Sequence, residues 1–566
     1  MIKSPLRSFL LPLYNNWYFF PLFMKTTLSF TRSITRGFRL RIALIVVLGL
    51  FGVFFSLAFV WCSKVLIDIA TKAREGDLTF YALLLILLMA FNILFRVMDT
   101  RLRKMTEVKL GNAIRYNLFS QLLYTRWQEL SLLHSGDMLT RFIKDSDEVV
   151  NVLVTSIPIS IVSLVQFSGA FVVLYFLDPT LAIILGLFLP IISLLGKSYY
   201  RLMHKYTLEV KESESQITSM VEENLQNQPV IRTFERQESE LERLQDLQLR
   251  LHGSVGKRTG VSVVANLILG VAFNGGYLTS FLWGAYGLAK GTVTFGIMTA
   301  YLQLVARLQR PLYDLLRLLP TLVTAKASME RLIYLTGFAK EASGESIPLQ
   351  GNVTLHVDNL TFSYKEGDKP VLQEFSMSAG PGTMVALTGK TGEGKTTFLR
   401  LLLGLVKPDS GTLRIADESV SLEISEQTRA NFVYVPQGGS LFSGTIRENL
   451  LLGDPEADDA TLRRVLAIAA ADFVFDLPEG LETVLGQDGG GLSEGQGQRI
   501  AIARALLRKG KVLLFDEATS ALDIETEKRF LNNLKAGLQD RVAIFITHSE
   551  EVAAFCDYRY HLSSES

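Results

Sequence analysis

The sequence predicts an α-helical membrane domain of six transmembrane helices, followed by an α/β domain of the phosphate-loop (P-loop) class. Three observations lead to this fold class. Six long apolar runs with few charges lie before about residue 336. A glycine-rich loop that begins at Gly389 stands between a strand-like run and a helix-like run. After about residue 350, strand-like runs such as Val353–Val357 and Leu360–Tyr364 alternate with helical segments, which favours a largely parallel sheet.

The composition excludes several other classes of protein. The 566 residues are enough for several domains, and 48% of them are hydrophobic, which permits membrane segments. Because 57 basic residues stand against 56 acidic ones, the chain has no overall attraction for nucleic acid, and we expect no nucleic-acid partner. Cys62 and Cys556 are far apart and lack metal-site spacing, so no disulfide framework is predicted.

The stretch Gly389–Thr397 has the full pattern of a phosphate-binding loop. It follows the predicted buried strand Met384–Leu387 and precedes the predicted helix Phe398–Leu403. Glycines let several backbone N–H groups face one anion, and the helix N-terminus and a lysine add positive charge. The alternative, a glycine turn with a chance Lys-Thr, does not explain this context. The predicted nucleotide-binding residues are Gly389, Lys390, Thr391, Gly392, Glu393, Gly394, Lys395, Thr396 and Thr397, of which Thr396 can also bind Mg²⁺.

The six apolar runs are each long enough, alone or with their flanks, to approach the roughly 20 residues that a membrane span needs. Two of them are separated only by Asp178, which predicts a hairpin with a very short turn. The predicted spans are Ile42–Ser63, Leu78–Phe95, Val149–Leu177, Pro179–Gly196, Thr259–Ala289 and Gly291–Ala306.

The links between the spans predict the orientation. The links after the second and fourth spans are long and rich in Lys and Arg, which is typical of the cytoplasmic side. Their helical periodicity predicts that helices continue beyond the bilayer. We therefore expect a multi-pass protein of the bacterial inner membrane with both termini in the cytoplasm. The expected domains are 1–39, an N-terminal cytoplasmic segment with an interfacial helix; 40–336, the membrane domain; 337–350, a linker; and 351–566, the nucleotide-binding domain.

The first residues contain a second possible start of translation. Met24 is a credible alternative start, and the basic and apolar residues that follow it are typical of a segment lying on the cytoplasmic interface. We therefore expect residues 1–23 to be dispensable.

Two further stretches carry chemistry that belongs with the phosphate loop. The apolar strand Val512–Phe515 ends in Asp516, which can reach Mg²⁺, and Glu517, which can polarise a water in line with the γ-phosphate. Two acidic residues at a loop start are also common without such a role. Leu492–Arg499 opens a helix and offers a second anion site. Since one nucleotide does not need two such sites from one chain, the second site indicates another copy.

In its motifs and their order the chain resembles the ATP-binding cassette (ABC) exporters of the half-transporter type, over almost its whole length after about residue 25. The motifs are the phosphate loop, the Leu-Ser-x-Gly-Gln signature at Leu492–Gln496, Phe515–Glu517, Ser520–Asp523 and His548. The resemblance implies ATP and Mg²⁺ as cofactors and an ATPase that drives transmembrane transport. Two patches that chemistry alone makes ordinary turns, His134–Arg141 and Glu222–Phe234, resemble the coupling helices that touch the nucleotide domain.

The resemblance assigns roles to matching residues. Tyr364 resembles the aromatic residue that stacks on adenine, and His548 the switch histidine that contacts the γ-phosphate. Gln437 resembles the glutamine that contacts Mg²⁺ or the attacking water, and Lys395, Thr396 and Asp516 complete the phosphate and metal ligands. With Glu517, these are the expected catalytic and metal-binding residues. Ser493, Gly495 and Gln496 would belong to the nucleotide site of the opposite subunit.

The sequence departs from the family pattern at three places. Glu494 stands in the signature where Gly is usual, and its carboxylate near ATP is expected to slow closure. Gln487 replaces the usual Glu of the loop that contacts the coupling helices. The chain ends soon after His548, so the nucleotide domain is expected to lack part of the usual helical tail.

One membrane half and one nucleotide half imply that two chains pair. Both halves of an ATP site are intact here, so we expect a homodimer, while a heterodimer with a similar half-transporter stays open. By resemblance, ATP closes the nucleotide domains and hydrolysis resets an alternating-access cycle.

The polar residues of the spans bear on the transported molecule. Arg307 and Arg310 lie about one turn apart, and Arg307 is roughly 24 Å from Gly291 at 1.5 Å per residue, so it is expected near the inner leaflet. There it either holds an anionic lipid headgroup or simply extends to the interface. Lipid or amphiphile export leads, and multidrug export is the alternative. The other polar residues of the spans include Asn92, Gln166, Asn266, Asn274 and Gln303.

A different class of function is an ATP-gated channel or a regulator of another protein. The complete hydrolytic set disfavours it, because gating by binding alone does not require Glu517. The six spans exclude a soluble cassette protein, and an importer is disfavoured because its membrane part is normally a separate chain.

Overall fold

The structure is a computed structural model that describes residues 29–562, except 132, 134–137, 140, 187, 343, 365–368, 391, 439 and 487–488. The chain divides into two compact units. The first contains the residues up to Leu123 and those from 134 to Gly337, and the second contains Tyr124–Leu133 and the residues from Phe338 onward. The short segment Tyr124–Leu133 therefore belongs to the second unit, although it follows the second long helix in sequence.

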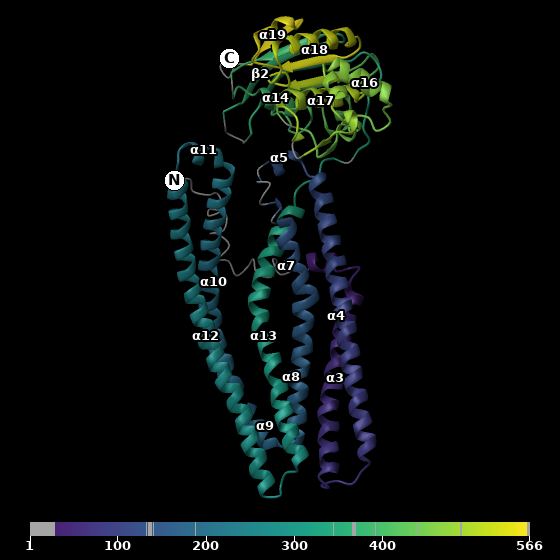
Figure 1. Cartoon of the computed structure of the whole chain (residues 1–566). Coiled ribbons are helices and arrows are strands. Elements are labelled where there is room, and N and C mark those ends of the chain that lie inside the picture. The colour runs from purple at the N-terminus through teal and green to yellow at the C-terminus, as the bar shows by residue number, and fades with distance from the viewer. Residues whose placement is uncertain are drawn as a thin grey trace. The chain divides into compact units, whose positions relative to one another are not determined.

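The first unit is built from long helices (Figure 1). Apolar stretches in the long helices explain why these segments pack side by side. Helix α3 packs on α4, α8 on α13, and α10 on α12. The bounds are α3 Arg39–Ala70, α4 Leu78–Leu123, η2 Arg141–Asp145, α7 Ser146–Asn151, η3 Val152–Ser156, α8 Ile157–Leu177, α9 Pro179–Gly186, α10 Phe188–Gln226, α11 Gln228–Thr233, α12 Gln237–Ala289 and α13 Phe295–Thr336.

Helices coincide with all six predicted spans, except that the sixth begins at Phe295 rather than at Gly291. Within the described residues, four helical segments are long and apolar enough to cross a membrane: Arg39–Ala70, Leu78–Leu123, Arg141–Leu177 and Gln237–Ala289. The other two predicted spans fall on α9 with the start of α10, and on α13. The predicted hairpin is confirmed, because Asp178 alone separates α8 from α9 and has an extended backbone.

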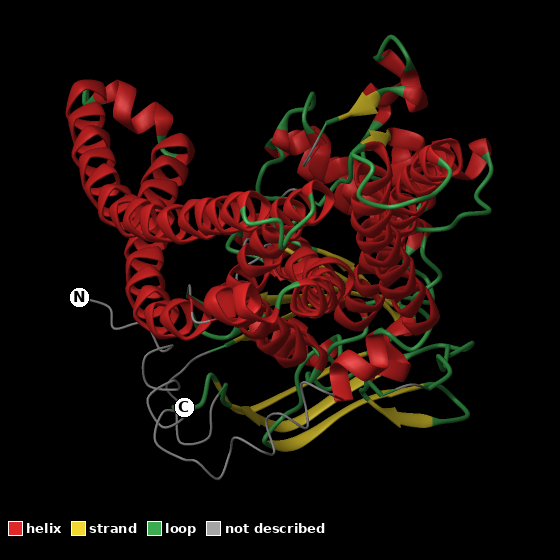
Figure 2. Cartoon of the chain, turned by 90° about the horizontal axis from the view of Figure 1, so that it is seen from below, coloured by secondary structure: helices red, strands yellow, loops and turns green. Residues whose placement is uncertain are grey.

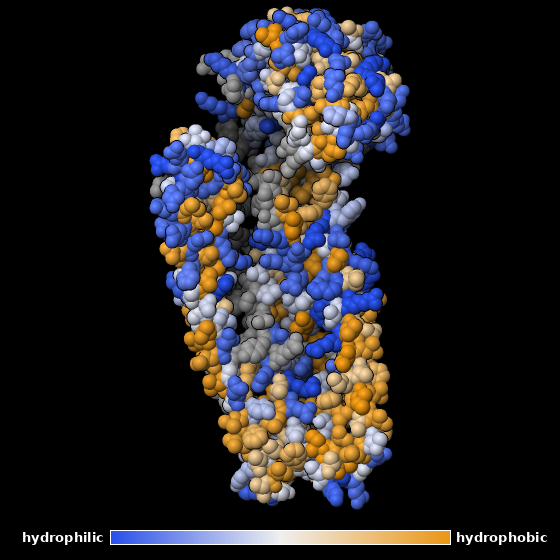
Figure 3. All heavy atoms as spheres, viewed as in Figure 1, coloured by the Kyte–Doolittle hydropathy of each residue, from blue (hydrophilic) through white to orange (hydrophobic). Residues whose placement is uncertain are grey.

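The long helices extend well past the thickness of a bilayer, as predicted. Helix α4 has 46 residues and α12 has 53, which correspond to about 69 Å and about 80 Å at 1.5 Å per residue. A hydrocarbon core is only about 30 Å thick. On the helical unit, apolar side chains gather toward the lower end in the view of Figure 3.

Three short links lie at that lower end of the helical unit (Figure 1): residues 71–77, Asp178 and residues 290–294. Two carboxylates fix this end, and the first of them, Asp68, is buried. The Asp68 carboxylate pairs with the Lys64 ammonium at 3.3 Å and accepts the backbone N–H of Gly296 at 3.1 Å, joining α3 to α13. The Asp178 carboxylate accepts from the Trp283 indole N–H at 2.7 Å and the Tyr301 hydroxyl at 3.2 Å.

The described patch Glu222–Phe234 contains the end of α10, the connecting residue Asn227 and the short helix α11. Most of the other patch, His134–Arg141, lies outside the described residues. The short helix described near it is α5, Trp127–Leu130, which belongs to the second unit.

The second unit contains two main sheets, and all the strands of the described residues lie in it (Figure 2). One is a parallel sheet with the order β11-β3-β10-β9-β6, and the other is an antiparallel sheet with the order β2-β1-β4-β5. The strands are β1 Thr354–Phe362, β2 Leu372–Ala379, β3 Met384–Thr388, β4 Ser410–Ala416, β5 Ser421–Glu423, β6 Phe432–Val435, β7 Gly444–Thr445, β8 Val484–Leu485, β9 Val512–Asp516, β10 Val542–Ile546 and β11 Tyr558–His561. The alternating strands and helices and the largely parallel core are thus confirmed.

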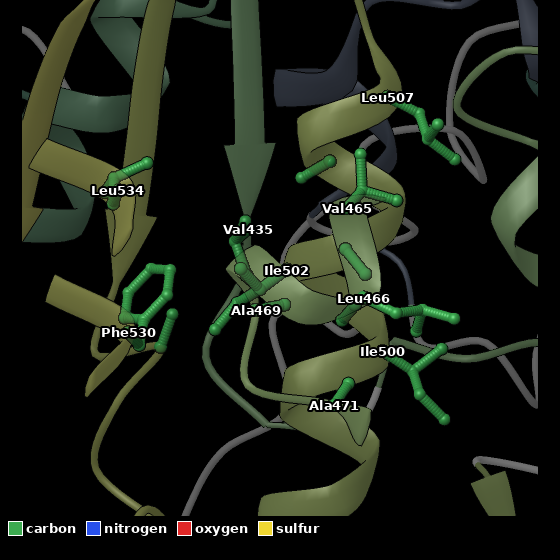
Figure 4. Close-up of a cluster of buried hydrophobic side chains, with 14 of the residues drawn as sticks. Val435, Val465, Leu466, Ala469, Ala471, Ile500, Ile502, Leu507, Phe530 and Leu534 are labelled. Carbon is green, nitrogen blue, oxygen red and sulfur yellow. The ribbon is translucent and has the colours of Figure 1, made fainter. Parts of the chain in front are cut away.

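The helices of this unit cover the parallel sheet. They are α14 Lys395–Leu402, η4 Glu426–Asn431, α15 Ile446–Leu451, α16 Asp459–Ile468, η5 Asp472–Asp476, η6 Gly480–Glu482, α17 Glu494–Leu507, α18 Ile524–Gly537 and α19 Glu550–Phe555. One apolar cluster joins α16 and α17 to the sheet: Figure 4 shows Val465 and Leu466 beside Ile500 and Ile502. These side chains are nearly inaccessible to water, and their burial stabilises the packing of α17 against the parallel sheet.

One detail of the strand prediction was wrong. The runs Val353–Val357 and Leu360–Tyr364 were predicted as two strands, but Thr354–Phe362 forms a single strand, β1. A register shift between Val357 and Leu360 explains the break in the pattern, because Asn359 adopts a positive φ of 47° at a bulge.

The close approach of α3 to α13 makes Gly296 a sensitive position. A Cβ there would lie 2.3 Å from the Lys64 carbonyl oxygen and 2.4 Å from the Asp68 carboxylate. We expect Gly296→Ala to destabilise the first unit by about 1–3 kcal/mol through overpacking, visible as a lower midpoint of thermal unfolding in detergent. The matched control is Gly275→Ala in α12, where nothing lies within 4 Å; it should not be destabilising. Equal midpoints for the two variants would contradict this packing.

Candidate nucleotide-binding site

The phosphate loop follows a strand whose five residues are all buried, β3, and runs directly into α14. Gly392 and Gly394 have φ of 93° and 89°, a conformation that side chains rarely adopt. At Gly394 a Cβ would also lie 2.8 Å from the carbonyl oxygen of Val371. The loop geometry therefore requires glycine there, and it presents the first turn of α14 to an anion.

Lys395 is the first residue of α14 and is buried. Its ammonium lies 2.6 Å from the carbonyl oxygen of Gly389, 3.2 Å from that of Lys390 and 3.0 Å from Nε2 of His548. Because an ammonium can only donate, His548 Nε2 is the acceptor in the contact with Lys395. Two carbonyl groups of the loop and His548 thus hold the lysine, and a phosphate oxygen would compete with each of these contacts.

Asp516 and Glu517 lie at the carboxyl end of β9. Burial raises the pKa of Asp516. The Tyr434 hydroxyl, which donates to this carboxylate at 3.3 Å, opposes the rise, whereas the nearby Glu517 carboxylate adds to it. Glu517 has a positive φ of 48°, and its N–H donates to the carbonyl oxygen of Ile546 at 3.0 Å. A strained backbone at this residue turns its side chain away from the strand direction, as is frequent at functional sites.

Four of the predicted site residues form one connected group. Glu517 accepts from the Gln437 amide at 2.8 Å, and its other carboxylate oxygen lies 3.4 Å from His548 Nε2, which in turn contacts Lys395. These residues follow β6, β9, β10 and β3, which are neighbours in the parallel sheet in that order. The carboxyl ends of neighbouring parallel strands are where α/β proteins gather their ligand-binding side chains.

The predicted metal ligands are consistent with Mg²⁺ in their chemistry. Thr396 is exposed at the start of α14, and Asp516 and Gln437 lie at neighbouring strand ends. Hydroxyl, carboxylate and amide oxygens are the donors that Mg²⁺ prefers, usually with phosphate oxygens and water completing the octahedron. No group of three or more His, Cys, Asp or Glu side chains in the described part of the chain forms a metal site without a nucleotide.

Tyr364 follows β1 and is 36% exposed. Its hydroxyl lies 3.1 Å from that of Thr397 and accepts from the Arg400 guanidinium at 2.6 Å, while its ring meets Phe362 edge to face. These contacts bring Tyr364 to the side of α14 and leave part of its ring accessible.

The signature residues make only local contacts in the described structure. Ser493 caps α17: its hydroxyl accepts the Gln496 N–H at 3.2 Å, and the Gln496 amide oxygen accepts the Ser493 N–H at 2.9 Å. At Gly495 a Cβ would lie 2.5 Å from the Ala521 carbonyl oxygen. Glu494 is exposed in the first turn. Among the described residues no hydrogen bond or ion pair joins this group to the phosphate loop. Gln487 lies outside the described residues.

Sequence reasoning missed two features of the site. The Glu393 carboxylate folds back and accepts the backbone N–H of Lys390, which places a negative charge inside the phosphate loop. Arg400 connects Tyr364 to the ring of Trp127. The charge of Glu393 was visible in the sequence, whereas nothing in the sequence places Trp127 beside a residue more than 270 positions away. Thr391 lies outside the described residues.

Comparison with known proteins identifies the family to which this arrangement of domains belongs. The family model described as "ABC transporter transmembrane region" matches residues 42–312, and that described as "ABC transporter" matches residues 372–520. The uncharacterized ABC transporter ATP-binding protein YfiB of Bacillus subtilis is 30% identical over 74% of this chain and 73% of its own. An ATP-dependent lipid A-core flippase of Xylella fastidiosa is 29% identical over 73% of this chain and 71% of its own. The structure of a bacterial Atm1-family ABC exporter with ATP bound has the same fold, with a TM-score of 0.77, 23% identity, and coverage of 93% and 94% of the two chains.

A membrane-spanning helical domain fused to a nucleotide-binding domain defines an ATP-driven membrane transporter. This chain belongs to the ATP-binding cassette exporters and is a half-transporter, with one transmembrane domain and one ATPase domain. It binds nucleotide and couples ATP hydrolysis to transport, and its half-transporter fold is consistent with dimer formation.

Glu517 is expected to act as the base for hydrolysis. The variant Glu517→Gln keeps the contact with Gln437 but cannot accept a proton, so we expect ATP binding to persist and phosphate release to fall by about a hundredfold or more. Equilibrium ATP binding and steady-state phosphate release measure the two effects. The control is Glu479→Gln, an exposed carboxylate elsewhere in the unit. Near-normal turnover of Glu517→Gln would remove the assigned base.

Glu393 is expected to weaken nucleotide binding by repelling the phosphates. Removing its charge in Glu393→Gln keeps an acceptor for the Lys390 N–H, so we expect the Kd for MgATP to fall by about fivefold, the effect of roughly 1 kcal/mol of charge repulsion. Added salt should shrink the difference. Glu374→Gln, in β2, is the control. A Kd that does not change would show that the carboxylate leaves the loop when ATP binds.

Proposed function

We propose that two copies of this chain form a homodimer that uses ATP to export or flip a lipid or another amphiphilic molecule across the bacterial inner membrane. The observation that carries the substrate class is a polar layer between α8 and α13, inside the helical unit. Its centre is Arg307. The nucleotide-binding domain and both termini are proposed to lie in the cytoplasm.

The polar layer is formed by side chains of α8 and α13 that face one another. On α8, Ser160 and Ser163 are buried, and the Ser163 hydroxyl donates to the Asp314 carboxylate at 2.9 Å. The Gln166 amide lies 3.5 Å from the Arg307 carbonyl oxygen. Apolar clusters lie on both sides of this layer along α13, one reaching Leu308 and the other beginning at Met329.

Arg307 differs from the other polar residues of the spans. Asn92 donates to the Gly52 carbonyl at 2.9 Å, Asn274 to the Gly270 carbonyl at 2.8 Å, and Gln303 to the Ser63 hydroxyl at 3.3 Å. Within the described part of the chain, no carboxylate pairs with the half-buried Arg307 guanidinium. A charge inside a membrane without a protein partner supports a ligand that supplies one.

The depth of Arg307 favours this role over a simple extension to the interface. Helix α13 begins at Phe295, so Arg307 lies about 18 Å from its end at 1.5 Å per residue. In a hydrocarbon core of about 30 Å this is near the middle, deeper than counting from Gly291 predicted. An anionic headgroup would neutralise the guanidinium while its apolar part contacts the neighbouring apolar clusters.

The nucleotide site supports pairing with a second copy. In one chain, the signature group of Ser493, Gly495 and Gln496 is separate from the phosphate loop, so a second copy would supply it. We propose that Gln437, Glu517 and His548 act on the attacking water and the γ-phosphate, and that Tyr364 stacks on adenine. Mg²⁺ would be held by Thr396, Gln437 and Asp516 and would neutralise charge on the phosphates. Gln437 already contacts Glu517, which supports a shared role.

The proposed domains are an N-terminal segment 1–39, a membrane domain 40–336, a linker 337–350 and a nucleotide-binding domain 351–566.

Closure of two nucleotide domains around ATP would move the helices of both chains, and hydrolysis would reset them. ATP-coupled flux of a labelled lipid in vesicles tests this transport. Single-channel currents without flux would instead indicate a channel, and stimulation of ATPase by amphiphilic drugs alone would indicate multidrug export.

Arg307 is expected to decide which lipids stimulate the ATPase. The variant Arg307→Gln should lose stimulation by anionic lipids, with the half-maximal lipid concentration rising by about tenfold or more, because a charged hydrogen bond contributes about 1.5–3 kcal/mol. ATPase activity of the protein in nanodiscs with graded fractions of phosphatidylglycerol measures this. Asn274→Ala, an intramembrane change whose amide bonds within its own helix, is the control. Equal stimulation of both variants would remove Arg307 from the substrate site.

A further inference from the structure

The short helix α5 is part of the nucleotide-binding unit although α4 leads directly into it. The Arg126 N–H donates to the Ala339 carbonyl at 3.0 Å, and the Glu341 N–H donates to the Tyr124 carbonyl at 2.8 Å. Thr125 and Lys340 form an antiparallel bridge between these two contacts. The segment that follows α4 is thus fixed in register against the residues that follow α13.

Arg400 connects α5 to the predicted adenine-stacking residue. Its guanidinium carbon lies 4.5 Å from the centre of the Trp127 ring, and the same guanidinium donates to the Tyr364 hydroxyl at 2.6 Å. Trp127 packs against the core cluster that also contains β1 and α14 residues. A cation over a tryptophan ring is the strongest of the cation–aromatic pairs.

The arrangement leaves room for movement. A surface hollow of about 650 Å³ is lined by Arg126 and Gln128 beside α5, by Phe362–Tyr364, and by the loop Gly404–Asp409. Tyr364 and α5 therefore border the same hollow, and a base that stacks on Tyr364 changes the position of a ring that Arg400 holds. Arg400 lies on α14, whose first residues belong to the phosphate loop.

We propose that Arg400 is a positioning residue that reports adenine binding to α5 and, through the continuous chain, to α4. Adenine on Tyr364 fixes the tyrosine hydroxyl, the hydroxyl fixes the guanidinium, and the guanidinium fixes Trp127. This inference rests on the proposed stacking role of Tyr364. Since coupling between two sites is reciprocal, breaking the contact at Trp127 must also change the affinity for ATP.

The first experiment uses the fluorescence of Trp127 in the full-length protein, taken as the difference between the wild type and Trp127→Phe. We expect MgATP to change this emission and tripolyphosphate, which fills the phosphate loop without a base, to leave it unchanged. Calorimetry measures binding of each ligand separately. An unchanged Trp127 emission while ATP is bound would overturn the relay and leave the nucleotide site intact. Absence of ATP binding would instead overturn the proposed site.

The second experiment is a double-mutant cycle on the Kd for ATP. We expect Trp127→Leu and Arg400→Gln each to weaken ATP binding by about threefold, the effect of a partly exposed cation–aromatic pair, and the double variant to be no weaker than either single one. The matched control is Arg463→Gln with Phe475→Leu, which breaks a pair of the same 4.5 Å separation elsewhere in the unit and should leave the Kd unchanged. Additive effects of the Trp127 and Arg400 changes would show that the two residues act only through stability.

Discussion

The structure of the nucleotide site depends on the meeting of four parallel strand ends at Glu517. The strand order β3-β10-β9-β6 is also the order of contact from Lys395 through His548 and Glu517 to Gln437. Glu517 follows β9 directly, Gln437 and His548 lie two residues after β6 and β10, and the phosphate loop connects β3 to Lys395, so the register of the sheet largely sets their separation. A slip of one residue in β9 would turn its side chains to the opposite face, and the group would come apart.

In this arrangement the site is satisfied without a nucleotide. Lys395 binds carbonyl groups of its own loop, and Glu393 binds the Lys390 N–H. A triphosphate must therefore replace internal contacts, so only the difference between the two sets contributes to its affinity. The signature residues are equally satisfied, because Ser493 and Gln496 cap their own helix. If a second chain's signature closes on ATP as proposed, the free energy released would be smaller than a count of new contacts suggests, which would favour a readily reversible cycle.

The sequence predicted those parts of the site that local chemistry determines. A phosphate loop needs glycines at fixed positions next to a buried strand and a helix, and Gly392, Gly394 and Lys395 meet that requirement in a short stretch. The spans were predictable because an apolar run of sufficient length has few other uses. By contrast, the single strand β1 was missed because a bulge at Asn359 interrupts its alternation. The place of α5 was missed because its contacts with residues 339–341 and Arg400 are long-range and leave no local pattern.

The ATP site and the proposed substrate site differ in the same way: the first depends on local sequence, and the second on long-range packing. ATP meets side chains that each follow a strand, and their geometry changes little with the sequence around them. In the proposed function the substrate would meet Arg307, whose effect depends on the depth of α13 in the membrane and on the polar side chains of the neighbouring helix α8. One guanidinium in the polar layer would select for charge but not for shape. On the proposed function, such a transporter would accept a class of anionic amphiphiles, and any finer choice among them would have to come from the apolar side chains on either side of that layer.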